Sequence, residues 1–263
     1  MDADSELVGY FHKHLVPIFF SCQKAEHKQD FIFTAFVLSV RDQWFLITAG
    51  HCIKAVEQLV HEHGYQIVQC SLIDTMSLEA KHRHPVPFDY IGSNPTSLSQ
   101  SREFDYGIIE VSDHYKRLLE ANNVQPLNEE VWKKQPSNVD FYMLLGVPAE
   151  LTKKDLNTVQ ITSTLLGVEV LDQRPEEFPE SNVPLFYGRI NLNESLSNIE
   201  GMSGGPIFGF YKNDKGELKY WLLALQSRWL PSSRYIMACP TKLLGEFLEE
   251  MVHKIVTNTR GTA

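Results

Sequence analysis

Residues 201–206 read Gly-Met-Ser-Gly-Gly-Pro, and this is the most informative stretch of the chain. A serine hydroxyl is a weak nucleophile that needs a base to take its proton and backbone N–H groups to stabilise the oxyanion on an attacked carbonyl. Gly201 allows a conformation that directs its N–H toward the same point as the N–H of Ser203. The stretch predicts Ser203 as a nucleophile, with an oxyanion hole made by Gly201 and Ser203. A plain glycine-rich turn between two strands is the other interpretation.

The same residues also fit Gly-x-Ser-x-Gly, the nucleophile elbow of α/β-hydrolases. That motif requires a helix directly after the serine, and then an acid and a histidine further along the chain. Here Pro206 and a strand-like run follow. The histidine that comes later is His253, on the expected terminal helix, and the aspartate that comes later is Asp214, in a loop. Order and context therefore exclude the elbow.

A histidine and an aspartate upstream complete a possible triad. Residues 31–52 contain two strand-like runs that lead into Thr-Ala-Gly-His-Cys, which places His51 where a buried strand ends and a short helix begins. Asp105 stands directly before the apolar run 106–111, which would bury its carboxylate beside the histidine. Asp89 has similar neighbours but lies in a loop-like setting, so Asp105 is favoured. Its expected role is to accept the imidazole N–H and stabilise the imidazolium formed during attack.

Short strands separated by turns dominate the rest of the pattern, which favours a barrel or a sandwich. The expected strands are residues 15–22, 31–40, 44–48, 66–72, 106–111, 138–145, 159–170, 184–190, 207–211, 220–226 and 234–239. Residues 23–30 are polar and suit a hairpin loop. Helices are expected at 4–13, for a turn or two after Gly50, and at 113–122. A terminal helix begins at Thr241, with an apolar stripe from Leu244 to Ile255.

The polar stretch 122–137 predicts a joint between two lobes. The expected organisation is an N-terminal extension with a helical pattern, a lobe with the histidine and aspartate, a lobe with the serine, and a terminal helix with its tail. These parts span residues 1–14, 15–125, 126–240 and 241–263. The predicted fold class is all-β, with two antiparallel barrels and a C-terminal α-helix.

Composition narrows the partners and the location. The 263 residues carry a formal net charge of −9, which disfavours nucleic acid and anionic membrane surfaces as partners. The N-terminus is acidic and its apolar run, residues 15–20, is too short for a signal core or a membrane span, so a cytoplasmic location is expected. Four cysteines without a Cys-x-x-Cys pair are expected to be reduced, mostly buried thiols; they are Cys22, Cys52, Cys70 and Cys239.

Two histidine pairs are the best metal candidates. His61 and His63, like His82 and His84, are separated by one residue, so on a strand each pair would share a face. Neither pair is accompanied by a cysteine or carboxylate cluster, and both lie in polar, loop-like segments. The sequence predicts no metal and no other cofactor.

Three motifs in order resemble the trypsin-like (chymotrypsin-fold) serine peptidases: TAGHC at 48–52, DYGIIEV at 105–111 and GMSGGP at 201–206. The resemblance covers about residues 15–257. It implies two antiparallel six-stranded β-barrels with the active site between them. The bacterial HtrA-like and glutamyl-endopeptidase-like branches look closer than the digestive enzymes, because LGVP at 145–148 and ACP at 238–240 before a helix are similar to their segments.

The resemblance also implies substrate-binding positions. Ser227 matches the serine that helps hold the catalytic aspartate. Ser227, Arg228 and Trp229 would pair with the substrate backbone as an added strand. Ser197 falls near the base of the S1 pocket, with Tyr235 on a wall of that pocket.

Two positions depart from the family pattern. Digestive members carry an acidic residue directly before the nucleophile, which pairs with a freshly cut N-terminus; this chain has Met202. The intact chain is therefore expected to have a formed oxyanion hole without processing. Thr34 stands near the cysteine that secreted members bridge to the one after the histidine, so Cys52 lacks that partner.

The sequence thus predicts a serine endopeptidase that cleaves proteins or peptides through His51, Asp105 and Ser203. Its expected setting is intracellular, under the control of a regulatory protein partner, as in a bacterial stress or phage-defence effector. Two alternatives remain open. One is a non-catalytic peptide-binding module on a protease fold, and the other is an esterase with the same triad.

Overall fold

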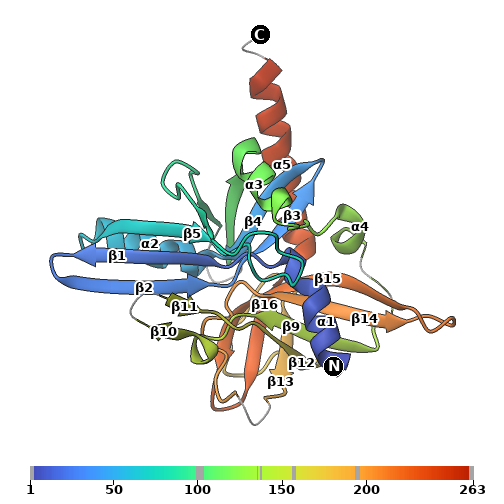
Figure 1. Ribbon diagram of the computed structural model, residues 1–263. Coiled ribbons are helices and arrows are strands. Elements are labelled where there is room, and N and C mark those ends of the chain that lie inside the picture. Colours follow the sequence, from blue (N-terminus) through green and yellow to red (C-terminus); the bar gives the residue numbers. More distant parts are fainter. Residues whose placement is uncertain are drawn as a thin grey trace.

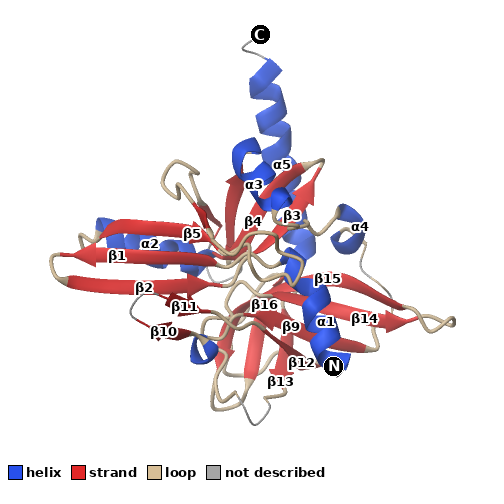
Figure 2. Cartoon of the chain, viewed as in Figure 1, coloured by secondary structure: helices blue, strands red, loops and turns tan. Residues whose placement is uncertain are grey.

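The computed structural model describes residues 3–98, 104–134, 136, 138–155, 158–192 and 196–260. Short antiparallel strands are its main regular elements, and helices lie at its periphery (Figures 1 and 2). The strands gather in two lobes, one from the first half of the chain and one from the second. The predicted all-β class with a C-terminal helix is confirmed, while the division of the chain at residues 125 and 126 stays a prediction.

The C-terminal lobe is a closed six-stranded barrel in the order β12-β13-β16-β15-β14-β9. Its interior is apolar and fully buried at positions such as Leu144, Ile207 and Ile236. Closing the ladder removes the unpaired edges that an open sheet exposes. The strands are β9 (Phe141–Gly146), β12 (Thr164–Val170), β13 (Phe186–Ile190), β14 (Pro206–Lys212), β15 (Leu218–Leu230) and β16 (Tyr235–Pro240).

The N-terminal lobe differs in detail from the expected closed barrel. Its described strands form two four-stranded sheets, β3-β4-β8-β7 and β2-β1-β5-β6, which share one apolar core. In the described residues the isolated bridge between Leu15 and Phe36 links the start of one sheet to the edge of the other, and the ladders form no closed ring. The strands are β1 (Ile18–Lys24), β2 (His27–Phe33), β3 (Phe36–Val40), β4 (Gln43–Ala49), β5 (Gln66–Leu72), β6 (Val86–Pro87), β7 (Thr96–Leu98) and β8 (Tyr106–Val111).

The first hairpin corrects the sequence prediction of a loop at 23–30. The β1–β2 ladder continues to the pair Lys24 and His27, and a tight turn follows in which Ala25 has φ +51°. β2 is an edge strand, where exposed polar side chains are tolerated, so its first residues resembled a loop. The predicted strand 159–170 is likewise divided, between β11 (Thr158–Gln160), which pairs with β10 (Lys153–Asp155), and β12.

The helices lie at the periphery of the two lobes (Figure 1). They are α1 (Ala3–Phe11), the 3₁₀ turn η1 (His12–His14), α2 (Gly50–His61), α3 (Asp113–Ala121), α4 (Glu129–Trp132), the 3₁₀ turn η2 (Ala149–Leu151) and α5 (Thr241–Arg260). α2 has twelve residues and is longer than the turn or two expected. None of the described helices is long and apolar enough to cross a membrane.

The two terminal helices pack on the lobes in different ways. Phe11 of α1 is buried against Phe208, Phe210 and Tyr220 of the C-terminal barrel. α5 begins at Thr241 as predicted, buries the first part of its apolar stripe and projects from the body (Figure 1). The side chain at the end of that stripe, Ile255, lies outside those that the structure describes.

Candidate active site

His51 is held by Asp105 through two hydrogen bonds. β4 ends at Ala49, and His51 is the second residue of α2, while Asp105 directly precedes β8. β4 and β8 are paired so that Ala49 lies opposite Tyr106, which brings the histidine and the aspartate side by side. Nδ1 of His51 lies 2.7 Å from Oδ2 of Asp105, and the backbone N–H of His51 donates to Oδ1 at 2.7 Å. The alternative acid, Asp89, instead accepts the N–H of Gly92 in its own turn.

Ser227 makes a further contact with the same carboxylate. Its hydroxyl donates to Oδ2 of Asp105 at 2.5 Å, and the side chain is almost fully buried. The β15–β16 ladder shifts register between Gln226 and Arg228. Such a bulge re-aims the side chain of the extra residue, here toward the aspartate. The structure therefore places Ser227 where the family resemblance implied.

The pair shifts the pKa values of both partners. Burial alone would lower the pKa of His51, but the hydrogen bond and charge of Asp105 raise it above its ordinary value. Burial alone would raise the pKa of Asp105, but the hydrogen bonds from His51 and Ser227 and the His51 charge lower it. The side chain of His51 is 49% exposed, so its second nitrogen is accessible to a ligand. The arrangement can hold one tautomer and stabilise an imidazolium.

The glycine-rich stretch forms a turn with a defined orientation. The N–H of Met202 donates to the carbonyl of Ile199 at 3.0 Å, and Gly201 has φ +90°, as in type II turns. The carbonyl of Glu200 accepts the N–H of Ala149 at 2.7 Å. Because C=O and N–H point in opposite directions across a trans peptide, the N–H of Gly201 points away from Ala149.

The turn is also packed against the segment that leads to His51. Gly204 has φ +90°, and a Cβ there would lie 2.5 Å from the carbonyl oxygen of Thr34 and 2.8 Å from the N of Ala49. Its N–H donates to the carbonyl of Gln226, whose own N–H donates to Gly205. This close approach explains the glycine at 204 and brings the serine turn to the junction of the lobes.

Ser203 itself is half-buried. The next residue, Gly204, lies against Ala49 near His51, and its N–H donates to the carbonyl of Gln226, the neighbour of Ser227. Within the described residues its hydroxyl makes no hydrogen bond, to His51 or to any other group, and neither its N–H nor that of Gly201 donates to another residue. The structure thus joins histidine, aspartate and Ser227 by hydrogen bonds. Backbone contacts of the serine turn place Ser203 near these three residues. A hydrogen bond from Ser203 to His51 stays a prediction.

The open space beside this group is a cavity of about 390 Å³. Of the predicted substrate-binding residues, Ser227 and Arg228 line it. Its lining is His51, Phe104, Asp105, Ser227, Arg228, Met237 and Cys239. All four cysteines are described, and each is buried and unpaired.

The other predicted binding residues lie outside that cavity. Trp229 donates its Nε1–H to Oδ1 of Asn198 at 3.0 Å. Tyr235 contacts Arg189, whose guanidinium lies over its ring and donates to its hydroxyl. Ser197 is exposed and donates hydrogen bonds to the carboxylate of Glu150. The sequence did not predict Glu150 as a residue of the site. An exposed glutamate in a short loop carries no sequence signal of such a role.

Thr34 links the two lobes through the hydrogen bonds of its side chain. Its side chain is fully buried, donates to the carbonyl of Gly201 at 2.9 Å and accepts the N–H of Val147 at 2.9 Å. Its own carbonyl accepts the hydroxyl of Thr48 at 2.8 Å. Hydrogen bonds thus connect the segment before His51 to the serine turn.

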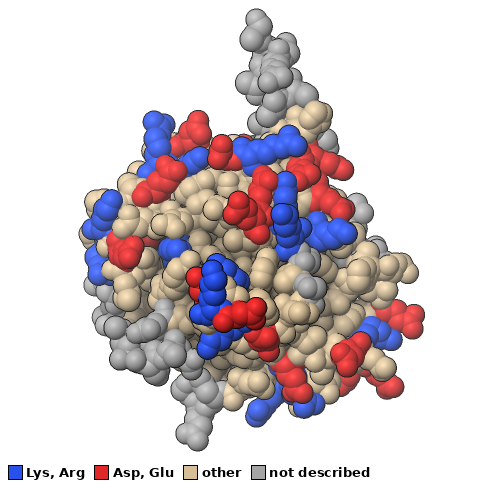
Figure 3. All heavy atoms as spheres, turned by 90° about the vertical axis from the view of Figure 1, so that its right-hand side faces the viewer, with Lys and Arg blue, Asp and Glu red and all other residues tan. Residues whose placement is uncertain are grey.

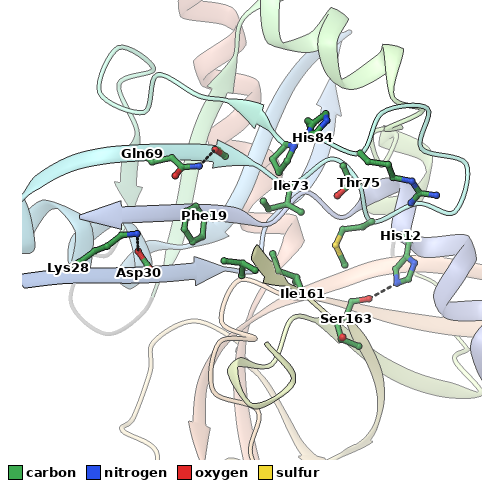
Figure 4. A pocket seen from close by; sticks show the side chains of 16 residues that line it. His12, Phe19, Lys28, Asp30, Gln69, Ile73, Thr75, His84, Ile161 and Ser163 are labelled. Atoms are coloured by element: carbon green, nitrogen blue, oxygen red, sulfur yellow. Dashed lines mark hydrogen bonds and ion pairs between the residues drawn. The ribbon is translucent and has the colours of Figure 1, made fainter. Parts of the chain in front are cut away.

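A second, larger cavity of about 850 Å³ shares no residue with the first (Figure 4). It contains a second histidine–serine contact, in which Nε2 of His12 lies 2.5 Å from the hydroxyl of Ser163. Nδ1 of His12 is buried without a hydrogen-bond partner, and burial lowers the pKa of this residue. Among the described residues no carboxylate orients this imidazole, so the pair lacks the third member of a triad there.

Charge and metal-ligand patterns do not mark another site. On the face drawn in Figure 3, acidic and basic side chains are interleaved, and no basic patch stands out. In the described part of the chain, no three histidine, cysteine, aspartate or glutamate side chains come together as metal ligands. The pairs His61–His63 and His82–His84 are exposed.

Comparison with known proteins adds solved structures of low sequence identity, while no family model and no curated protein matches the chain. One is the thermostable serine protease AL20 from an extremophilic microorganism, with TM-score 0.48, 15% identity, and coverage of 87% of this chain and 91% of that chain. Another is the active form of the Rv3671c protease from M. tuberculosis, with TM-score 0.47, 15% identity, and coverage of 89% and 78%. Deg5 has TM-score 0.48, 14% identity, and coverage of 93% of both chains.

Proposed function

We propose that this chain is a serine endopeptidase in which His51 is the general base, Asp105 orients it and Ser203 is the nucleophile. The observation that carries the proposal is the carboxylate of Asp105, which binds Nδ1 and the backbone N–H of His51 while accepting the hydroxyl of Ser227. This arrangement fixes the tautomer whose other nitrogen can accept a proton. The serine turn is packed against the same segment.

In the proposed reaction, Oγ of Ser203 attacks the scissile carbonyl and its proton passes to Nε2 of His51. The N–H groups of Gly201 and Ser203 donate hydrogen bonds to the developing oxyanion, and Asp105 stabilises the imidazolium. His51 then gives the proton to the leaving amine, and an acyl-enzyme forms. Water attacks that ester with the histidine again as base, which releases the acid and restores the serine.

The proposed substrate is an extended protein or peptide segment. β14 pairs with β15 only as far as Leu225, so from Ser227 onward β15 is paired on one side, with β16. An extended chain can add to the other side through backbone hydrogen bonds. Ser197 and Tyr235 are proposed to contact the substrate side chains. A cytoplasmic location and control by a protein partner complete the proposal as sequence predictions.

Fluorophosphonate labelling tests the nucleophile. Intact-mass analysis should show one adduct on the wild-type chain, and peptide mapping should place it on Ser203. Ser203→Ala should remain unlabelled while keeping the wild-type melting temperature, and His51→Ala should remain unlabelled while still showing a cooperative melting transition. A wild-type protein that is folded and never labelled would overturn the proposal.

Substrate assays separate the two alternatives. The lack of a hydrogen bond between Ser203 and His51 favours a peptide-binding module as the second candidate. Such a module would bind peptides without forming an adduct. An esterase would form the adduct and hydrolyse esters but not peptides. An endopeptidase should generate new protein N-termini in a proteome treated with wild type and not in one treated with Ser203→Ala.

A further inference from the structure

A carboxylate from outside the predicted triad holds the loop that leads into the serine turn. Glu150 lies in η2, and its Oε2 accepts the backbone N–H groups of Ser197 and Asn198, each at 3.0 Å. The hydroxyl of Ser197 lies 3.1 Å from both carboxylate oxygens. Three donors of one loop therefore converge on one charged group, and hydrogen bonds to a charged acceptor are about twice as strong as neutral ones.

The same two segments meet again at the oxyanion turn itself. Ala149, the neighbour of Glu150, donates its N–H to the carbonyl of Glu200 at 2.7 Å. A Cβ at Gly201 would lie 2.9 Å from the N of Ala149 and 2.9 Å from the carbonyl oxygen of Val147. The position of η2 therefore fixes the direction of the Glu200–Gly201 peptide. If that peptide rotated, its carbonyl would replace the Gly201 N–H in the oxyanion hole.

Because residue 202 is methionine, the loop has no acidic side chain at that position to pair with an N-terminus. Its side chain is fully buried in an apolar cluster with Leu144, Leu196 and Ile199, and it lies against Gly146. A thioether cannot pair with a cationic N-terminus, so apolar packing holds the turn from inside. Contacts on the outer side of the loop must supply the remaining restraint.

We propose that Glu150 is a positioning residue that keeps the oxyanion turn formed in the intact chain, in place of an ion pair with a processed N-terminus. The inference rests on the proposed peptidase function and concerns the regulation of the same site. Glu150 does not touch the reacting atoms. It acts through Ser197 and Asn198 on the Glu200–Gly201 peptide, while Asn198 in turn accepts the N–H of Glu200 at 3.0 Å.

Kinetics of three variants test the inference. Glu150→Ala removes all the contacts, Glu150→Gln keeps the length and one acceptor oxygen, and Glu120→Ala is a control on an exposed glutamate of α3. Losing one oxyanion donor costs on the order of a hundredfold in kcat, so a turn that is displaced part of the time should lose about tenfold or more. We expect that loss in kcat for Glu150→Ala, with a smaller change in KM that reflects the released Ser197. Glu150→Gln should be intermediate, and Glu120→Ala should match wild type.

Inhibitor binding provides a readout that a purely structural role would not move. A peptide boronate, whose adduct occupies the oxyanion hole, should bind Glu150→Ala more weakly by the same factor as kcat. The amine-side product peptide, which has no carbonyl or carboxylate in the hole, should bind both proteins equally. Thermal melting of each variant shows whether it is folded.

The outcomes distinguish failure of this inference from failure of the proposed function. A wild-type chain that is never labelled by a fluorophosphonate contradicts the peptidase, whatever Glu150 does. An active wild type with an equally active Glu150→Ala, or a loss confined to KM, overturns the positioning role. If Glu150→Ala does not fold, Glu150→Gln decides, because an unchanged kcat and an unchanged boronate affinity in that variant also overturn it.

Discussion

The hydroxyl of Thr34 donates to the carbonyl of Gly201 at 2.9 Å, across the junction between the lobe with His51 and the lobe with Ser203. The same oxygen accepts the N–H of Val147, so one side chain connects three segments. The threonine therefore fixes the serine turn relative to the lobe with His51.

Thr34→Val should therefore lower both stability and turnover. Valine has nearly the same shape, but it leaves the buried N–H of Val147 and the carbonyl of Gly201 without their partner, at a cost of about 1–3 kcal/mol in the free energy of unfolding. Urea unfolding and kcat measure the two effects. Thr75→Val, a half-buried threonine of the second cavity, is the matched control. Equal behaviour of the two variants would refute the link.

The pH dependence of activity should reflect the raised pKa of His51. Asp105 raises that pKa above 6.5, and the base acts only when it is neutral. The acid limb of kcat/KM should therefore have its midpoint above 6.5. Asp105→Asn removes the Asp105 charge that raises this pKa, so the midpoint should move to lower pH and kcat should fall by about 10⁴-fold. A midpoint that is the same in both proteins would contradict this account.

The same pair should make stability depend on pH in two windows. Because the pKa of Asp105 is lowered from 3.8, its contribution is present above that value and is lost as pH falls through the lowered pKa. Because the pKa of His51 is raised, its contribution is fully present below 6.5 and is lost as pH rises through the raised pKa. Melting curves of wild type and Asp105→Asn should differ most between the two windows.

The intact chain should react with an active-site phosphonate without proteolytic processing. Met202 is buried in apolar surroundings and cannot receive a charged N-terminus. Labelling of purified full-length protein, with its N-terminus verified by mass, measures this directly. A chain that stays inert until it is cut would show that the turn needs an activating cleavage. Met202→Asp should lose about 3 kcal/mol or more of stability, because it buries an unpaired charge.

Gly245→Ala should destabilise the protein although alanine favours helices. A Cβ at Gly245 in α5 would lie 2.3 Å from Cζ3 of the buried Trp132. Overpacking of this kind costs about 1–3 kcal/mol, more than the roughly 1 kcal/mol gained in helix propensity. Gly9→Ala in α1 is the control, since its nearest atom is 3.7 Å away, and it should be neutral or stabilising. Chemical denaturation separates the two.

Sequence reasoning identified the parts of the site that depend on residue type at fixed spacing. Asp105 is predicted beside His51 because an apolar strand follows it, and the pairing of β4 with β8 brings the two side chains into hydrogen-bonding contact. Ser227 followed from the family resemblance, and the structure places it on the aspartate. Fold class followed from the many short apolar runs.

The remaining features of the fold and the site could not be predicted, because they depend on contacts between segments that are distant in the sequence. The polar start of β2 resembled a loop, since an edge strand needs no apolar alternation on its outer residues. Glu150 is an exposed residue whose role arises only because η2 lies beside Ser197 in space, 47 positions further along the chain. The closing of each lobe depends on pairing between strands that are distant in the chain, and the described strands of the first lobe lie in two sheets.

The C-terminal lobe is a closed barrel and the N-terminal lobe consists of two sheets, so the two lobes should unfold in a defined order. A ring of six paired strands has no end from which to fray, so its backbone amides exchange with solvent mainly when the whole ring ruptures. The sheets around His51 and Asp105 end in unpaired margins and can loosen strand by strand. Mild heating should thus displace the base and its acid while the serine turn keeps its place, so that catalytic power disappears before the bulk of the fold.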